Sequence, residues 1–135
     1  GYMLVHTTNP ADRIQGAVTF ASLNGGGVAA LRAEGSGRRQ LIFSHVAQGD
    51  GYWTGMALFS PTGGTALVEL YSSEGNRLAS REVTLGERRV ATLDVLLQVG
   101  NVRGGYIQVK SSSEIFGFEL FGNLRSSILA AVPPQ

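Results

Sequence analysis

Few residues of this chain could perform chemistry, and the one loop that could hold a cation surrounds Asp50. In Gln48-Gly49-Asp50-Gly51 the glycines would let backbone carbonyls turn inward beside the carboxylate, as in calcium sites. EF-hand spacing is absent, so a turn-forming aspartate is the favoured interpretation. His6 and His45 fall short of a zinc ligand set in a chain without cysteine, although Asp or Glu could supplement them. We predict no metal site, with His6 at the surface and His45 half-buried and hydrogen-bonded.

Tyr52 and Trp53 are the aromatic pair that most suggests a ligand. Aromatic rings at a junction between strand and loop stack on sugar rings in many β-sandwich binding modules, a likeness of class only. The alternative is that Trp53 anchors the core, as a lone large aromatic usually does in a sandwich. We favour the core anchor and keep Tyr52, Trp53 and Asp50 as the candidate ligand-binding residues.

The stretch Gly25–Ala30, GGGVAA, matches the fingerprint G-x-G-x-x-A of dinucleotide sites. Such a site needs a full crossover helix after the glycines, and a helix here would end at Gly35. A second copy of the segment, described below, has Ser126-Ser127-Ile128 at the same place. The glycines are therefore assigned to a loop, and no cofactor is predicted.

No catalytic constellation is apparent either. The chain lacks G-x-S-x-G, H-E-x-x-H and phosphate-loop patterns. Its 10 acidic residues are scattered, so nothing indicates the carboxylate pair of a glycoside hydrolase. We predict that the chain is not an enzyme.

Composition narrows the class of protein further. A chain of 135 residues, 43% hydrophobic and 16% charged, is typical of one soluble globular domain. The net charge is +1 and the basic residues form no stripe, which argues against nucleic-acid binding. No stretch approaches the roughly 20 apolar residues that span a bilayer, so no membrane insertion is expected.

Short apolar runs separated by turns define the fold class. The turns are rich in the chain's 19 glycines, and no long helical pattern alternates with the runs. The pattern predicts an all-β, mostly antiparallel β-sandwich of roughly ten short strands. At most one helical turn is expected, near Leu93–Gln98, with Thr92 as its cap and Gly100 at its end. The first strands are expected at Tyr2–Thr8 and at residues 14–20, separated by a turn at Asn9–Asp12.

Two hairpins are predicted from turn chemistry. Thr65–Ser72 pairs with Arg77–Leu85 across the short connection Ser73–Asn76. Tyr106–Lys110 pairs with Ile115–Phe121 across a polar SSSE tip.

The beginning of the chain repeats its end. From Gly16/Gly117 to Leu31/Val132 the copies align without a gap, at an offset of 101 residues, so that residues 1–33 echo residues 105–133. A linker-like stretch, residues 34–39, separates the first copy from the rest. We favour a single domain, residues 1–135, in which the N-terminal piece completes the sandwich. The alternative is the tail of an upstream domain, with exposed edges prone to strand exchange or dimerisation.

The repeat makes Glu119 conspicuous, because its counterpart is Val18. Both faces of the strand around Glu119 are apolar, which predicts a position in mid-sheet. Either Phe116, Phe118 and Leu120 face the core while Ile115 and Phe121 meet a second layer, or Glu119 is buried with a partner.

The stretch Phe43–Tyr71, FSHVAQGDGYWTGMALFSPTGGTALVELY, carries a family resemblance. Its F-x-x-V-A-x-G-x-G start, the pair Trp53-Thr54 and the A-L-V-E-L-Y strand resemble a β-sandwich module of immunoglobulin or fibronectin type. Such modules stand near the C-termini of bacterial secreted and surface proteins, often in tandem. The resemblance covers residues 40–123, and Tyr52 and the helical turn depart from it.

The resemblance implies an extracellular, periplasmic or cell-surface setting and a spacer or adhesion role beside neighbouring domains of the same polypeptide. It carries no catalytic residues. We therefore expect a non-catalytic structural or interaction module of an exported bacterial protein. The alternative is a carbohydrate- or peptide-binding module that uses Tyr52, Trp53 and the adjacent loops.

Overall fold

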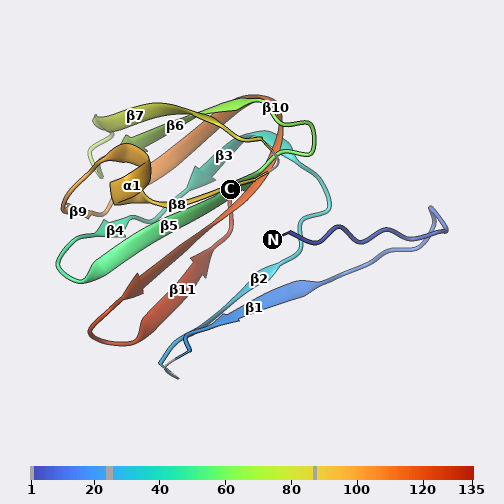
Figure 1. Cartoon of the computed structure of the whole chain (residues 1–135), viewed down its shortest axis with the longest axis horizontal. Coiled ribbons are helices and arrows are strands. Elements are labelled where there is room, and N and C mark those ends of the chain that lie inside the picture. The colour runs from blue at the N-terminus through green and yellow to red at the C-terminus, as the bar shows by residue number, and fades with distance from the viewer. Residues whose placement is uncertain (1, 24–25, 87) are drawn as a thin grey trace.

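The computed structural model describes residues 2–23, 26–86 and 88–135, and it consists almost entirely of antiparallel strands (Figure 1). The all-β prediction is confirmed. The elements of the described chain are β1 (Ala17–Ala21), β2 (Val28–Arg32), β3 (Arg38–Phe43), β4 (Ala47–Gln48), β5 (Tyr52–Phe59), β6 (Thr65–Tyr71), β7 (Arg77–Thr84), β8 (Arg88–Thr92), α1 (Leu93–Leu97), β9 (Val102–Arg103), β10 (Tyr106–Asn123) and β11 (Ile128–Val132).

Strand β10 lies at the centre of the fold and takes part in two layers. Its first part, Tyr106–Ser111, lies between β6 and β3. Its second part, Phe116–Asn123, pairs with β5 on one edge and with β11 on the other. Strand β7 continues the first layer beside β6, and β8 continues the second beside β5. The predicted mid-sheet position of the strand around Glu119 is thereby confirmed.

The predicted hairpin with its tip at Ser111–Glu114 is wrong, because β10 passes through these residues without reversing. The Ser111 hydroxyl donates to the carbonyl of Thr65 at 2.8 Å, and the Ser60 hydroxyl donates to the carbonyl of Glu114 at 3.0 Å. These bonds hold the segment extended, and a register shift in the middle of β10 lets it bend from one layer to the other. The segment also lacks the Gly, Asn or Pro that a tight reversal needs.

The predicted hairpin of β6 and β7 is confirmed. Its connection is closed by a bond from the Ser72 amide to the Asn76 carbonyl, at 2.8 Å. Gly75 has φ of 84°, a left-handed conformation that glycine adopts at low cost.

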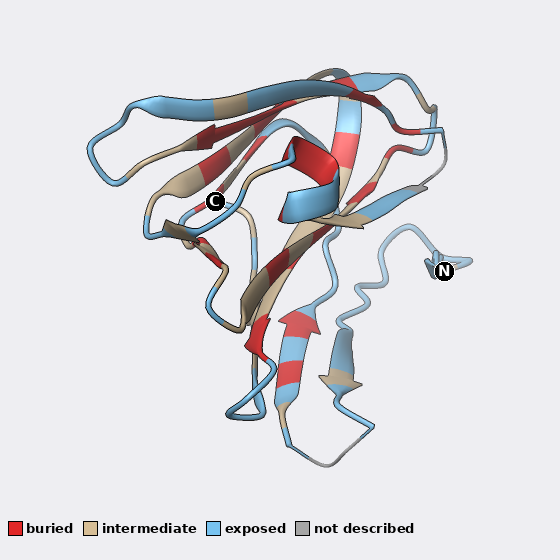
Figure 2. Cartoon of the chain, turned by 60° about the vertical axis from the view of Figure 1, so that its left-hand side comes forward, coloured by how far each residue is buried: buried red, intermediate tan, exposed pale blue. Residues whose placement is uncertain are grey.

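A contiguous hydrophobic core lies between the two layers. Figure 2 colours the buried positions of the strands and of α1 red. It collects apolar side chains from β3, β5, β6, β7, β10 and α1. The bulkiest fully buried apolar residues are Phe43, Leu41, Leu58, Leu70, Leu85, Leu93, Leu96, Ile107 and Ile115.

The helical turn α1 forms at the predicted place, and its three leucines are buried. Its ends differ from the prediction. The Thr92 side chain makes no capping hydrogen bond, and the helix ends at Gln98, with φ of 56°, rather than at Gly100. The described residues contain no helix of the length and apolar character needed to cross a membrane.

The N-terminal hairpin, formed by β1 and β2, makes an additional layer. It lies along β11 in Figures 1 and 2. The rings of Phe20 and Phe118 meet at 5.3 Å between centroids, and Ala29 and Leu31 are buried. The outer face of the second layer, at β10 and β11, is therefore covered by the N-terminal hairpin.

The N-terminal arm, residues Tyr2–Gln15, contains no strand. The predicted strand over Tyr2–Thr8 is wrong, and the strand predicted at residues 14–20 begins only at Ala17. The physical reason is the lack of a partner: strand backbone groups need a neighbour for their hydrogen bonds, and none in the described chain pairs with the arm.

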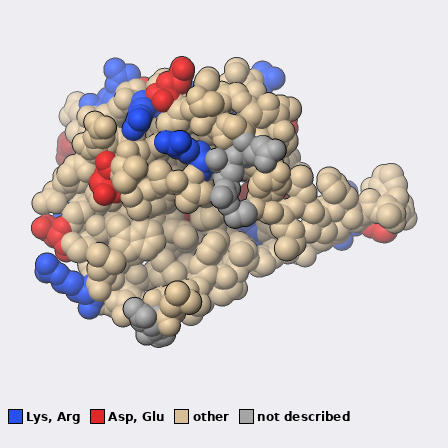
Figure 3. Space-filling model, viewed as in Figure 1, with Lys and Arg blue, Asp and Glu red and all other residues tan. Residues whose placement is uncertain are grey.

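The arm doubles back at the predicted turn Asn9–Asp12, where the Asp12 amide donates to the Asn9 carbonyl at 3.0 Å. It projects from the body, and on the face shown in Figure 3 few charged atoms lie along it. Only its first residue has an aromatic contact, a stack of Tyr2 on Phe59 at 4.2 Å between centroids.

Candidate functional site

Asp50 lies in an exposed turn, and its carboxylate is already paired. Gly49 and Gly51 both have φ of 90°, and Asp50 has φ of 54°. The Arg103 guanidinium donates to the Asp50 carboxylate at 2.8 Å and lies 5.8 Å from the centre of the Tyr52 ring. The predicted turn-forming role fits this geometry. In the described ranges no three metal-binding side chains gather, at Asp50 or elsewhere.

Tyr52 and Trp53 lie on opposite faces of β5, as neighbours on a strand must. Trp53 is half-buried on the outer face and packs against Gly122 of β10, where an added Cβ would lie 2.8 Å from its ring. Tyr52 lies on the other side, beside Arg103. The two rings therefore form no joint platform, and Trp53 stands outside the core rather than anchoring it.

A second pair of aromatic rings does share one face. Tyr71 of β6 and Tyr106 of β10 are cross-strand partners whose rings stack at 4.8 Å, with 5° between their planes. A shallow, open hollow of about 520 Å³ adjoins them. It is lined by Ile42, Ser44, Ser73, Gly105, Tyr106 and Gln108. An aromatic face next to neutral hydroxyl and amide groups is suited to a sugar ring.

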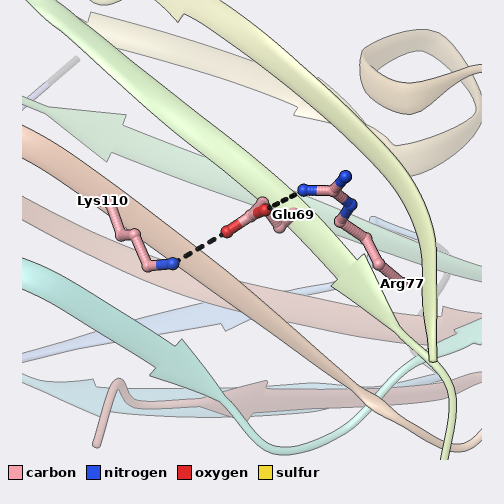
Figure 4. A network of polar contacts seen from close by, with 3 residues as sticks. All are labelled: Glu69, Arg77 and Lys110. Atoms are coloured by element: carbon pink, nitrogen blue, oxygen red, sulfur yellow. Dashed lines mark hydrogen bonds and ion pairs between the residues drawn. The ribbon is translucent and has the colours of Figure 1, made fainter. Parts of the chain in front are cut away.

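A charged network joins these two strands to β7 (Figure 4). The buried carboxylate of Glu69 accepts from Arg77 at 2.8 Å and from Lys110 at 3.0 Å. The hydrogen bond from Arg77, and then the one from Lys110, hold the pKa of Glu69 below its usual value. Glu69 is thus an ionised group that ties β6 to both of its neighbouring strands.

The sequence prediction missed this surface. Alternate positions on the predicted strand of β6 put Glu69 and Tyr71 on one face, which was the available signal. Tyr106 and Lys110 join them only through the pairing of β6 with β10, and residue spacing alone does not specify that register.

Glu119 is fully buried, and neither of its carboxylate oxygens has a hydrogen-bond partner. It lies on the core side of β10, paired with Met56 of β5 and Val132 of β11. Burial raises the pKa of Glu119 to about 8. Both alternatives stated from the sequence need correction: Glu119 is buried without a partner, and Phe118, on the opposite side of the strand, meets Phe20 of the N-terminal hairpin.

His45 is half-buried, as predicted, but its Nε2 has no hydrogen-bond partner, so the expectation of a satisfied ring is wrong. The ring lies against Phe121 at 4.2 Å between centroids. His6 is exposed in the N-terminal arm, as expected.

The glycine-rich motif is followed by a strand. Val28–Arg32, where a dinucleotide site would need a helix, form β2. Gly26 approaches Ser127, and Gly27 approaches Leu129, so closely that an added Cβ atom at either glycine would overlap the Cβ atom there. Asn24 and Gly25 lie outside the described residues.

The N-terminal hairpin repeats the pairing of the C-terminal hairpin, which consists of the second part of β10 and β11. Each matched residue of the second hairpin is offset by 101 positions from the first, the offset found in the sequence. Val18 pairs with Leu31 as Glu119 pairs with Val132. In the same way, the pair Phe20–Ala29 matches Phe121–Ala130, and the pair Ala21–Val28 matches Gly122–Leu129.

The two hairpins stack with the same orientation of their faces. One face of the N-terminal hairpin carries Phe20, Ala29 and Leu31. The corresponding face of the C-terminal hairpin points toward the core. In the folded chain the first of these faces lies on the outer side of the C-terminal hairpin, against Phe118 and Leu129. The contact is head-to-tail, since the inner face of one copy covers the outer face of the other.

No family model, no curated protein and no solved structure matches this chain.

Proposed function

We propose that the chain is a non-catalytic structural and interaction module of an exported or cell-surface bacterial protein. The observation that carries this proposal is the N-terminal hairpin, which repeats the register of the C-terminal hairpin and stacks on it. Head-to-tail stacking of like elements is how repeat proteins join one unit to the next. The module therefore links units of its own fold.

The exported setting rests on the resemblance over residues 40–123 to modules of bacterial secreted and surface proteins. In that setting the partners are neighbouring domains of the same polypeptide. Asp50, the polar residue that the sequence prediction singled out, fits a structural role because it is paired with Arg103. Glu69, which that prediction missed, fits the same role because it is paired with two cations.

The proposal is tested by removing the hairpin from its place. Leu31 is 7% exposed and Val28, on the same strand, is 67% exposed. Leu31→Asp places a charge in the apolar contact, and we expect the amides of β1 and β2 to lose their protection from hydrogen exchange while β5 and β10 keep theirs.

Val28→Asp is the matched control, and it leaves both sets of amides protected. If the two variants behave alike, the hairpin does not depend on this contact and the linking role loses its support.

A second candidate function is carbohydrate binding, and the stacked pair of Tyr71 and Tyr106 beside the hollow favours it. The site differs from the predicted one at Tyr52 and Trp53. Isothermal titration with a panel of neutral polysaccharides tests the candidate. Binding that Tyr106→Ala abolishes and that Trp53→Phe leaves intact would assign a sugar site to this face. Binding lost only with Trp53→Phe would assign the site predicted from the sequence.

A further inference from the structure

The N-terminal copy exposes apolar side chains at the positions that the C-terminal copy buries. With Tyr2 aligned to Tyr106, Met3 and Val5 correspond to Ile107 and Val109. With the offset of 101 residues, Ile14 and Val18 correspond to Ile115 and Glu119. All four counterparts in β10 are fully buried, whereas Met3, Val5, Ile14 and Val18 are about half exposed or more.

The backbone of the N-terminal copy has unpaired edges at the places where β10 pairs with its neighbouring strands. In β10 the first part is held between β6 and β3, and the second part pairs with β5. Within the described residues β1 pairs with β2 alone, and the arm pairs with nothing. The edge of β1 that matches the β5 side of β10 is therefore unpaired, next to the exposed apolar residues.

We propose that this surface is completed by a partner sheet of the same build as β3, β5 and β6, joined ahead of Tyr2 in the same polypeptide. The inference rests on the proposed function and names the partner for it. The partner sheet would cover Met3, Val5, Ile14 and Val18 with its apolar inner face. In this chain, the strands of the same build cover the counterparts of these residues in β10.

A second complete copy of the chain does not fit as the partner. Its β5 is already paired with β10 and β8, and its β6 with β10 and β7. Neither strand has a free edge for the arm. The partner must instead offer these strands with the place of β10 open.

The proposal also explains the docked position of the N-terminal hairpin. Phe20 and Leu31 share the face that would enter the partner's core, since their counterparts lie beside Glu119 on the core side of the second layer. In the isolated chain that face rests on Phe118. The partner sheet and the outer face of the second layer thus compete for this face. With the partner present, the hairpin links the two units by entering the partner's core, and its stacking on Phe118 is the state of the chain without the partner.

The test supplies the partner from the chain's own strands. A second copy of residues 38–105 is fused ahead of Tyr2, so that Tyr2 follows a glycine as Tyr106 follows Gly105. We expect hydrogen exchange to slow by about 100-fold or more at residues 2–7 and 15–22, to the level of Tyr106–Asn123. The nuclear Overhauser contact between the rings of Phe20 and Phe118 is expected to disappear.

A matched pair of substitutions makes the test specific. Val5 is 61% exposed and Leu4 56% exposed, but Val5 corresponds to the buried Val109 and Leu4 to the half-exposed Gln108. In the fused protein Val5→Asp removes the new protection and Leu4→Asp keeps it. In the unextended chain both variants leave the exchange of β3 to β11 unchanged.

Three results would overturn the inference: an added segment that stays unfolded, an added segment that folds and leaves the arm unprotected, and equal effects of the two variants. None of them bears on the linking role itself, which depends on the response of the unextended chain to Leu31→Asp. If Leu31→Asp left the amides of β1 and β2 protected, the proposed linking function would be refuted. The result of the fusion experiment could still be interpreted in that case.

Discussion

Replacement of Glu119 by valine is predicted to stabilise the protein, and to do so more at neutral than at acid pH. Valine is the residue at the matching position of the N-terminal copy, Val18, so the backbone of this hairpin accepts it. The substitution removes a fully buried carboxyl group that has no hydrogen-bond partner. Its apolar replacement restores packing against Met56 and Val132.

The magnitude follows from the difference between the folded and unfolded pKa of Glu119. Burial raises the pKa from 4.5 to about 8 in the folded protein. Above pH 4.5 the unfolded chain releases the proton and the folded chain retains it, so stability falls as the pH rises, until about pH 8. Each pKa unit corresponds to about 1.4 kcal/mol. At pH 7 the penalty is therefore about 3 kcal/mol, and below pH 4 it vanishes.

Urea unfolding, followed by Trp53 fluorescence at a series of pH values from 4 to 8, measures the effect. Glu119→Val should raise the free energy of unfolding by about 3 kcal/mol more at pH 7 than at pH 4. Glu119→Gln should flatten the pH dependence without the packing gain, and Glu82→Gln, at an exposed position of β7, should leave it unchanged. Equal pH dependence in the wild type and in Glu119→Val would refute the argument.

Two further predictions concern the surface of the sheets. Glu69→Gln should lower stability by about 1 kcal/mol at pH 7, because the carboxylate loses its bonds to two cations that are themselves half exposed. The pKa of Glu69 is lowered on folding, so the stabilisation exists above about pH 4.5 and disappears as the pH falls through the folded pKa; denaturant titrations at pH 7 and pH 3 give the comparison. Gly122→Ala should destabilise by about 1–3 kcal/mol and shift the emission of Trp53, because the new methyl group would lie 2.8 Å from the indole ring. Gly35→Ala, whose new methyl group would have no heavy atom within 4 Å, should be neutral, and thermal melts of the two variants give the comparison.

The sequence predicted elements whose formation is local. The hairpin of β6 and β7 has its turn chemistry at Ser73–Asn76, and α1 has three leucines at helical spacing, so both were found. The tip predicted at Ser111–Glu114 failed for the opposite reason. Serines permit either a turn or a strand, and their hydroxyl bonds to Thr65 and within β10 become visible only once β6 is placed beside them.

The functional surfaces depend on register, which the sequence left open. The repeat indicated that Val18 and Glu119 are equivalent, but not that Glu119 would lack a partner. Tyr52 and Trp53 attracted attention as neighbours in sequence, although neighbours on a strand face opposite ways. Tyr71 and Tyr106 are far apart in the sequence and form the stacked pair because β6 and β10 align them.

The stacking of the N-terminal hairpin on the C-terminal one is the central claim, and one nuclear Overhauser spectrum tests it directly. With phenylalanine and tyrosine rings labelled in the full chain, cross-peaks are expected between the rings of Phe20 and Phe118, whose centroids lie 5.3 Å apart. The rings of Tyr71 and Tyr106, 4.8 Å apart within the main sheet, provide the internal control. Cross-peaks in both pairs would support the stacked module. A spectrum with the tyrosine contact present and the phenylalanine contact absent would contradict it.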